Sequence, residues 1–453
     1  MAIRVATVEN LYHRLRSHYI AYQNCRFSTL RIMTNVDFGR RRSLSESSLR
    51  QKSMKPPSDN EPHRYEAIVV GAGPAGIVVV GNLIEQMKTP ILWVDDEFQA
   101  GRLNKYYREV PSNTRVKLFV AFADALSTFQ DVIKESQRPN AYTLLQDLRQ
   151  DATCHIAEAA DLCLMLTKGL DRSRGVHKKL GTVSSASWSD HSKWTITIQS
   201  STPCDTAAAE ISSNMLIMCT GSRPKVGSLP VSHLKDIGLD PALKPSLLSM
   251  TLSRDSKITI AVIGASHSAI LVLRNLYNLA CSTHPFLRVK WFTRHPLRYA
   301  EQRDGWILLD NTGLKGEVAT WARENLEAGK LELSNVSKYL EKVECSREKE
   351  DEIYKEHLPL CTHIVQAIGF TPQELPSFEK NGSKLDLNYN HLSQEFEEKG
   401  KKIDGLYGAG IAWPERVTDP EGNVSLDVGL WKFMKSVKKV APYWQGGLGA
   451  NLI

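Results

Sequence analysis

The sequence predicts an α/β fold in which one strand–turn–helix unit occurs twice. Apolar strand residues run into a Gly-rich turn, GAGPAG at residues 71–76, and then into an apolar helix. The stretch KITIAVIGASHSAILVLRNL at residues 257–276 repeats this order around the related turn GASHSA. A second buried strand follows each helix. Strands that alternate with helices in this way are typical of parallel sheets.

The length and the charge distribution limit the classes of protein that fit. At about 150 residues per domain, the 453 residues allow two or three domains. The formal charge is +7, but residues 1–55 hold 11 Lys and Arg against 3 Asp and Glu, so the remaining residues hold 46 against 47. The body is therefore nearly neutral, and we expect no nucleic-acid groove on it.

The basic N-terminal arm and linker, residues 1–61, are predicted to lie outside the folded body. The arm is rich in Arg and Ser and poor in acids, which is typical of a mitochondrial presequence; a disordered extension fits as well. We expect an intracellular protein, cytoplasmic in the first place and mitochondrial as the alternative. The body is predicted to divide into a first domain at residues 62–245 and 381–453 and a second domain at residues 246–380.

Each glycine of the first turn has a steric role in holding a dinucleotide. Gly71 makes the tight turn, Gly73 lets the backbone approach a pyrophosphate, and Gly76 lets the helix pack on the strand. The pyrophosphate then lies at the helix N-terminus, where free N–H groups and the helix dipole favour an anion. The turn also argues against a membrane span over the apolar residues 67–84. The predicted cradle is Gly71, Gly73, Pro74, Ala75 and Gly76.

The second strand of the first unit, at residues 90–97, ends in acid. Asp95 lies about 20 residues after Gly76, where a carboxylate can accept hydrogen bonds from the ribose hydroxyls. Asp96 is the less favoured choice, and a solvated turn acid is the alternative for both. Strand, glycine turn, helix, second strand and acid thus occur in the order of a Rossmann-like dinucleotide-binding domain.

Further strands follow each unit. GTVSSASW at residues 181–188 and KWTITIQ at residues 193–199 alternate in polarity and predict a β-meander, after which a buried strand runs into TGSRP. In the second half, hairpin-like sequence surrounds VECSREKEDEIY at residues 343–354. The strand in HIVQAIGFTP then closes the second unit at Gly369.

The second unit differs from the first where its ligand would differ. Its second strand ends in Arg294, with His295 beside it, rather than in acid. An arginine there suits a 2′-phosphate, which a carboxylate would repel; a plain surface arginine is the alternative. Ser266 and Ala269 replace the second and third glycines, so the backbone approaches phosphate less closely while the helix still packs well. We therefore expect a second dinucleotide, held more loosely near Gly264.

Two tandem units, each closed by a strand and a glycine turn, with a late Gly-rich strand end LYGAGIA at residues 406–412, resemble the two-dinucleotide-domain flavoproteins. The resemblance covers residues 63–440 and implies two Rossmann-like domains, the second inserted in the first. It implies FAD in the first domain and NAD(P)H in the second. By the same resemblance, Gly221 and Gly369 close the two units and Gly410 returns to the flavin.

Within that superfamily, residues 101–125 are similar to the flavin-containing and N-hydroxylating monooxygenases. The resemblance places Arg102 in a Gly-Arg turn near the flavin and Ser112-Asn113 at the isoalloxazine, with Asn113 in the catalytic role. A helix or turn cap is the alternative for Asn113. The turn with Ser266 and Ser268 is also similar to the NADPH turn of these enzymes. The eight cysteines form no C-x-x-C or C-x-x-x-x-C pair, which argues against dithiol reductases.

The resemblance implies an NADPH-dependent FAD monooxygenase. NADPH reduces the flavin, molecular oxygen adds to it, and the resulting hydroperoxide attacks a small nucleophilic substrate. A reductase or diaphorase without oxygen insertion and a non-enzymatic nucleotide-fold regulator are the alternatives. His267 and His295 stand alone without ligand spacing, so we predict no metal. Residues 310–326 are either a surface helix or a pocket wall, and Trp413 either shields the flavin or is structural.

Overall fold

The computed structural model describes residues 64–189, 193–199 and 210–445, so the predicted N-terminal arm lies outside the described residues. Its larger sheet has the order β19-β18-β6-β7-β8-β1-β2-β5, with β22 also beside β8 and β21 between β20 and β22. The strands are β1 (Arg64–Val70), β2 (Ile91–Asp95), β5 (Val176–Leu180), β6 (Thr182–Ser189), β7 (Lys193–Gln199), β8 (Glu210–Met218), β18 (Ser377–Lys380), β19 (Ser383–Lys384), β20 (Asn388–Asn390), β21 (Glu395–Glu398) and β22 (Lys401–Gly408).

The centre of this sheet is parallel and buried on both faces. β1 pairs in parallel with β2 and β8, and β22 pairs in parallel with β8. Ala67 and Val69 of β1 pack against helices on one face, while Ile68 and Val70 pack on the opposite face. This alternation explains the unbroken apolar sequence of β1. The meander predicted over β6, β7 and β8 is confirmed, because these strands pair antiparallel in that order.

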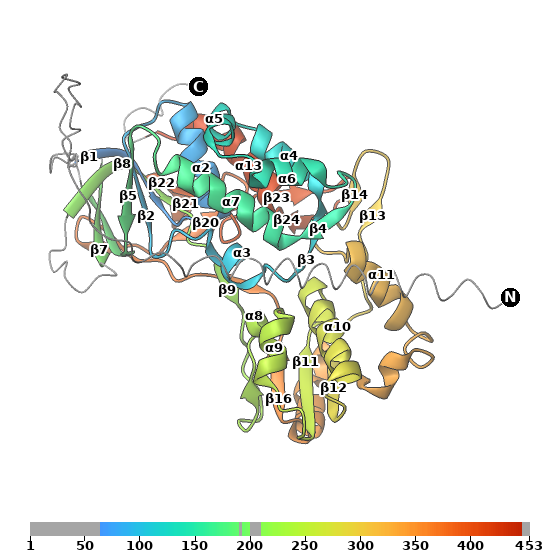
Figure 1. The fold of residues 1–453 in the computed structure, drawn as a ribbon. Coiled ribbons are helices and arrows are strands. Elements are labelled where there is room, and N and C mark those ends of the chain that lie inside the picture. Colours follow the sequence, from blue (N-terminus) through green and yellow to red (C-terminus); the bar gives the residue numbers. More distant parts are fainter. Residues whose placement is uncertain (1–63, 190–192, 200–209, 446–453) are drawn as a thin grey trace, which may run out of the picture. The chain divides into compact units, whose positions relative to one another are not determined.

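Helices cover one face of the larger sheet, and α2 packs against α7 and α13 there (Figure 1). α2 begins with Pro74 in its first turn, where a missing N–H costs nothing, and Gly73 caps it. The helices of this layer are α2 (Pro74–Glu85), α3 (Gly101–Tyr106), α4 (Val116–Asp124), α5 (Ser127–Glu135), α6 (Ala141–Asp147), α7 (Ile156–Leu170) and α13 (Leu430–Val440).

The second sheet is parallel throughout, with the order β10-β16-β11-β12-β15. All its strands come between β8 and β22 in the chain, so the second domain is inserted in the first, as predicted. Figure 1 shows α10 beside β11 and β12. The elements are β10 (Lys235–Asp236), β11 (Ile258–Ile263), β12 (Leu287–Thr293), β15 (Leu340–Glu344), β16 (His363–Gln366), α8 (Leu239–Ala242), α9 (Pro245–Thr251), α10 (His267–Ser282), α11 (Gly316–Asn325) and α12 (Glu350–His357).

The predicted hairpin around residues 343–354 is wrong. β15 ends at Glu344, and after a short 3-10 turn the chain forms α12, whose first turn holds Glu350, Asp351 and Glu352. Acids there are stabilised by the positive end of the helix dipole, so the charged run favours a helix start over a strand.

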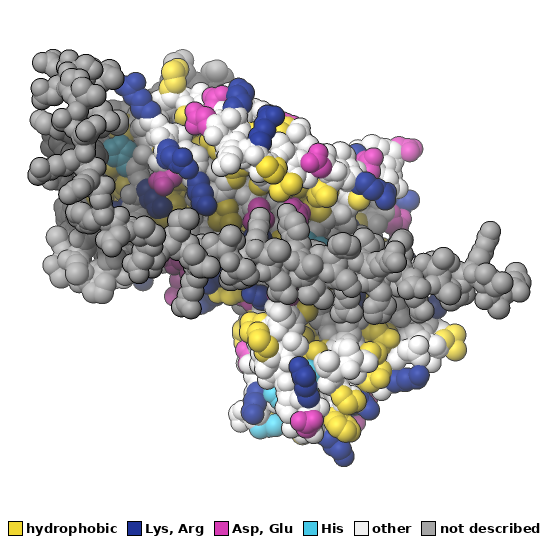
Figure 2. All heavy atoms as spheres, viewed as in Figure 1, with side chains coloured by type: hydrophobic (Ala, Val, Ile, Leu, Met, Phe, Trp, Pro, Cys, Tyr) yellow, Lys and Arg dark blue, Asp and Glu magenta, His cyan; other side chains and the backbone are white. Residues whose placement is uncertain are grey.

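Four short antiparallel pairs complete the described part of the chain. They are β3 (Pro111–Arg115) with β4 (Thr153–His155), β9 (Ser222–Pro224) with β17 (Phe370–Pro372), β13 (Glu301–Gln302) with β14 (Ile307–Leu308), and β23 (Arg416–Thr418) with β24 (Val424–Leu426). The domain limits at residues 61, 245 and 380 stay predictions. On the face drawn in Figure 2, basic and acidic side chains are interspersed. None of the helices in the described ranges is long and apolar enough to cross a membrane.

Candidate active site: two glycine turns at the carboxyl ends of two sheets

The first glycine turn connects β1 to α2 and leaves no room for side chains at two of its glycines. Gly71 has φ +111°, and a Cβ there would lie 2.3 Å from the Cys219 carbonyl oxygen. A Cβ at Gly76 would lie 1.8 Å from the Gly71 carbonyl oxygen. At Gly73, in contrast, no heavy atom lies within 4 Å of a Cβ position. The free space beside Gly73 is therefore where a ligand can approach the backbone at the N-terminus of α2.

Segments distant in the sequence surround this space. A Cβ at Gly410 would lie 2.4 Å from the Ala75 Cβ, so the end of the late strand returns to the first turn. The start of α3 approaches it as well, because a Cβ at Gly101 would lie 3.2 Å from the Gly73 Cα. Just beyond Cys219, the Thr220 hydroxyl is buried without a protein partner. An open anion cradle and an orphaned hydroxyl fit a bound dinucleotide such as FAD.

Asp95 lies at the end of β2, but its carboxylate is already engaged by the backbone. Oδ2 accepts from the Ala72 N–H at 2.7 Å, and Oδ1 accepts from the N–H groups of Glu97 at 2.8 Å and Phe98 at 2.6 Å. A carboxylate has about four acceptor positions, so one remains for a ribose hydroxyl. Asp95 thus holds the glycine turn in place besides any ribose contact. Asp96, the less favoured choice, is exposed, and its pKa is raised, first by burial of the carboxyl and then by Asp95 and Glu97.

Arg102, in α3, forms an ion pair with Asp240 at the start of α8. The Tyr107 hydroxyl donates to the other oxygen of Asp240 at 2.9 Å, and the guanidinium lies 4.7 Å from the centre of the Tyr106 ring. Its Nε is buried without a partner. The sequence reasoning missed Asp240 and Tyr107, because no motif contains them.

Ser112 and Asn113 lie on the short strand β3, so Asn113 is not a helix cap; α4 begins at Val116 with Arg115 as its cap. Ser112 is buried, and its hydroxyl accepts from the Thr114 N–H at 2.9 Å. Asn113 is exposed, and its amide oxygen accepts only a 3.3 Å bond from the Thr114 hydroxyl. Ser112 therefore shapes the strand, while the Asn113 amide N–H₂ is available to a ligand.

The second glycine turn connects β11 to α10. Gly264 has φ +130°, and a Cβ there would lie 2.4 Å from the Ala367 carbonyl oxygen. Ser266 caps α10 without a side-chain bond to it, and Ala269 is buried against the turn. Ser268 is half-buried in the first turn of α10. A cavity of about 320 Å³ opens at Gly264 and Ser266, and it is lined by Ile263, Gly264, Ala265, Ser266, Phe292, Arg294, His295, Cys345, Tyr354, Ala367, Ile368 and Gly369.

Arg294 reaches this cavity, but it is paired with Glu350 of α12. Its Nε donates to Glu350 Oε1 at 3.0 Å, and its Nη2 donates to the same oxygen. The Tyr354 hydroxyl donates to that oxygen as well, at 2.8 Å. The charged run that contains Glu350 gave no signal for this contact. The predicted 2′-phosphate contact therefore competes with a carboxylate of the chain itself.

His267, the first residue of α10, has a buried Nδ1 without a partner. Burial, and after it the charges of Lys315 and Arg274, lower the pKa of His267 to about 4. Lys315 precedes α11 and pairs with Asp310, and a Cβ at Gly316 would lie 3.8 Å from the Ser112 carbonyl oxygen. The predicted turn and helix at residues 310–326 thus lie beside β3. His267 is neutral at physiological pH and can donate or accept a hydrogen bond.

Three other predicted positions lie in the core or next to paired strands. Trp413 packs with Tyr389 and Phe396 in the core, although its indole N–H has no protein partner. Gly221 and Gly369 have positive φ, and they flank the paired strands β9 and β17. Within the described ranges, no group of three His, Cys, Asp or Glu side chains is arranged to hold a metal ion.

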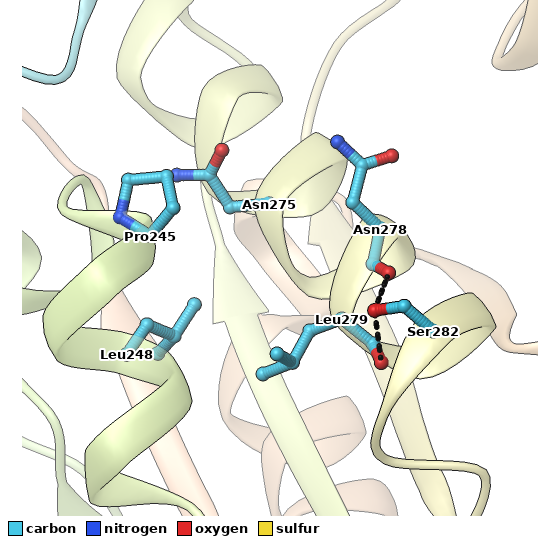
Figure 3. A pocket seen from close by; sticks show the side chains of 6 residues that line it. All are labelled: Pro245, Leu248, Asn275, Asn278, Leu279 and Ser282. Atoms are coloured by element: carbon cyan, nitrogen blue, oxygen red, sulfur yellow. Dashed lines mark hydrogen bonds between the residues drawn. The ribbon is translucent and has the colours of Figure 1, made fainter. Parts of the chain in front are cut away.

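A second cavity, of about 210 Å³, lies between α9 and α10 (Figure 3). Asn275 lies on its wall and donates to the Ala242 carbonyl at 3.1 Å. The lining residues carry no titratable side chain, so they offer no acid–base chemistry. They are Pro245, Leu248, Asn275, Asn278, Leu279 and Ser282.

Comparison with known proteins defines the class. No family model matches the chain. Monooxygenase AgnR1 of Paecilomyces divaricatus is 49% identical over 388 residues, which cover 84% of this chain and 98% of the relative. The chain therefore belongs to the family of this monooxygenase.

Solved structures agree in fold. An ornithine N-hydroxylase of Kutzneria sp. 744 matches with a TM-score of 0.54 and 13% identity, over 84% of this chain and 98% of that one. At this identity the likeness concerns the fold alone, and it confirms the predicted α/β architecture. An open structure of cyclohexanone monooxygenase matches with a TM-score of only 0.35 and 16% identity, over 58% of this chain and 45% of that one.

Proposed function

We propose that this chain is an NADPH-dependent FAD monooxygenase that transfers oxygen from molecular oxygen to a small nucleophilic substrate. One observation carries the proposal: two glycine turns lie at the carboxyl ends of parallel strands in two sheets, and opposite charges stand after them, Asp95 at the end of β2 and Arg294 directly after β12. Carboxyl ends of parallel strands are where open α/β sheets bind ligands. Two such turns favour two different dinucleotides.

The residues around the first turn would hold FAD. Gly73 and the N-terminus of α2 offer backbone N–H groups to the pyrophosphate, and Asp95 retains one acceptor position for a ribose hydroxyl. The buried Thr220 hydroxyl has no protein partner and is available to the cofactor. The second turn, with Ser266 and Arg294 at its cavity, would hold NADPH.

When bound, the flavin supplies the redox chemistry and the activation of oxygen. The chain contributes position, hydrogen bonds and exclusion of water. Asn113 is the residue whose role separates oxygen insertion from simple reduction, because its exposed amide can donate to a partly charged oxygen. Reduction by NADPH requires no such donor.

Absorbance and product stoichiometry test the proposal. The purified chain should show flavin absorbance that NADPH bleaches and air restores, and oxygenated product should account for most of the NADPH consumed. Colourless protein that cannot be reconstituted with FAD would exclude both the monooxygenase and the reductase. Hydrogen peroxide in place of product, with every small nucleophile tried, would favour the reductase.

Asn113→Ala should keep FAD and keep the rate of flavin reduction within a few-fold. The variant should release hydrogen peroxide in place of oxygenated product. A hydrogen-bond donor placed at developing charge stabilises the transition state by about 3 to 4 kcal/mol, and the variant lacks it. Asn278→Ala is the matched control, since it removes an amide from the cavity between α9 and α10 (Figure 3). Identical peroxide yields for both variants and wild type would make Asn113 a structural residue.

A further inference from the structure

The cavity beside the second glycine turn is lined by Arg294, whose charge is offset by the carboxylate that pairs with it. Glu350 does not itself line the cavity but pairs with Arg294, and 41% and 22% of the Arg294 and Glu350 side chains are exposed. Arg294 can therefore meet a ligand that enters the cavity while it stays paired with Glu350. The charge that such a ligand meets is that of the pair, not that of an isolated arginine.

Glu350 is held as a carboxylate by its neighbours. Burial raises the pKa of Glu350, but the hydrogen bonds from Arg294 and Tyr354 outweigh burial, and the pKa lies below its usual value. Glu350 begins α12 and Tyr354 lies one turn later on the same helix. Both donors point to a single oxygen, Oε1. The acid is thus part of a built arrangement.

We propose that Glu350 sets the choice between NADPH and NADH by neutralising Arg294. The inference rests on the proposed function, in which the second turn holds a nicotinamide dinucleotide. A 2′-phosphate that reaches Arg294 also approaches the Glu350 carboxylate, which repels it. The 2′-hydroxyl of NADH, in contrast, can donate a hydrogen bond to that carboxylate. The chain therefore accepts both dinucleotides and discriminates between them less than an unpaired arginine would.

A positioning role for Glu350 makes the opposite prediction. If the carboxylate served to hold Arg294 in the orientation that grips the phosphate, its removal would loosen the guanidinium and weaken NADPH. The guanidinium uses its Nε and Nη2 for Glu350, which leaves Nη1 free. The two roles thus differ in the sign of the effect on the phosphorylated cofactor.

Calorimetric titration of the full-length holoenzyme with NADP⁺ and NAD⁺ tests the proposal. Glu350→Gln removes the charge and keeps the shape. Glu341→Gln is the matched control, because Glu341 of β15 pairs at 2.7 Å with Lys290 of β12, a cation that, unlike Arg294, does not line the cavity. Tyr354→Phe keeps the charge and removes one hydrogen bond to Oε1.

Glu350→Gln should tighten NADP⁺ about fivefold, in line with one partly exposed charge contact. It should weaken NAD⁺ slightly, so the ratio of the two dissociation constants shifts toward NADP⁺. Glu341→Gln and Tyr354→Phe should leave the ratio unchanged. An unchanged ratio of dissociation constants in Glu350→Gln would overturn this inference but not the proposed function. Weaker binding of NADP⁺ in both Glu350→Gln and Tyr354→Phe would do the same. Wild type that binds neither dinucleotide would overturn the proposed function with it.

Discussion

The turns at Gly71 and Gly264 share a scaffold and differ in what they present to a ligand. In each, the first glycine has positive φ, and a tryptophan of the following strand donates its indole N–H to that glycine's carbonyl. Trp93 donates to Gly71 at 3.0 Å, and Trp291 donates to Gly264 at 2.7 Å. Both turns are therefore held by contacts within the protein, and the ligand need not form them.

The differences lie at the helix contact and at the end of the second strand. Gly76 leaves α2 in direct contact with its turn, whereas Ala269 keeps α10 one methyl group farther from its own. Asp95 is turned inward onto the amides of its own turn, while Arg294 is turned toward Glu350. The first turn is thus tight and internally bonded, and the second is looser, as a cofactor that leaves in each cycle requires.

Exchanging Gly76 and Ala269, the residues where each helix contacts its turn, should have the largest effect, and this effect is on the free energy of unfolding. Gly76→Ala places a Cβ 1.8 Å from a backbone oxygen, so we expect it to lower the free energy of unfolding by at least about 3 kcal/mol. Ala269→Gly only removes a methyl group and should cost about 1 kcal/mol. Urea unfolding of both variants measures the difference. Equal costs would mean that α2 can shift away from its turn as easily as α10.

The sequence predicted the scaffold better than the contacts of individual residues. Glycine spacing and buried strands reveal both units, because steric rules act on neighbouring residues. Asp240 and Glu350 contact predicted site residues from distant segments, and no local pattern marks such partners. The helix that begins at Glu350 was missed because the charged run was interpreted as hairpin-like, whereas acids in the first turn of a helix stabilise it. The predicted site residues themselves stay predictions.

Gly73→Val should weaken FAD binding at the first turn without destabilising the fold. No heavy atom lies within 4 Å of the Cβ position and φ is −75°, so the chain should fold with a nearly unchanged melting temperature. The branched side chain fills the space that the pyrophosphate must enter, so bound FAD should weaken at least about tenfold. The flavin-to-protein absorbance ratio measures this. Ser266→Val, at the matching position of the second turn, should keep its flavin; loss in both variants would contradict the assignment of FAD to the first turn.

Arg294→Ala should affect the second turn alone. We expect NADPH to bind roughly 10- to 150-fold more weakly, because a charge-assisted bond is lost and Glu350 is left without its cation. NADH should change little. Arg288→Ala is the control, since it removes the same charge from β12 away from the cavity. Michaelis constants for both cofactors measure the effect. Equal losses for NADPH and NADH would make Arg294 a structural residue.

A pH-dependent effect should come from the first helical residue after each turn, which is Pro74 in α2 and His267 in α10. Burial lowers the pKa of His267 to about 4, below its usual value, and Lys315 and Arg274 act in the same direction. Above about pH 6.5 the histidine is neutral whether the chain is folded or unfolded. As the pH falls from about 6.5 to 4, the unfolded chain takes up a proton that the folded chain excludes, so stability is lost by at most about 1.4 kcal/mol per pH unit.

His267→Gln cannot titrate, and its stability should fall less over this range. Urea unfolding at pH 8 gives the packing cost of the substitution, and the same measurement at pH 5 gives the titration. A constant difference between wild type and variant at both pH values would mean that His267 takes up its proton in the folded chain and that the second turn tolerates a charge there.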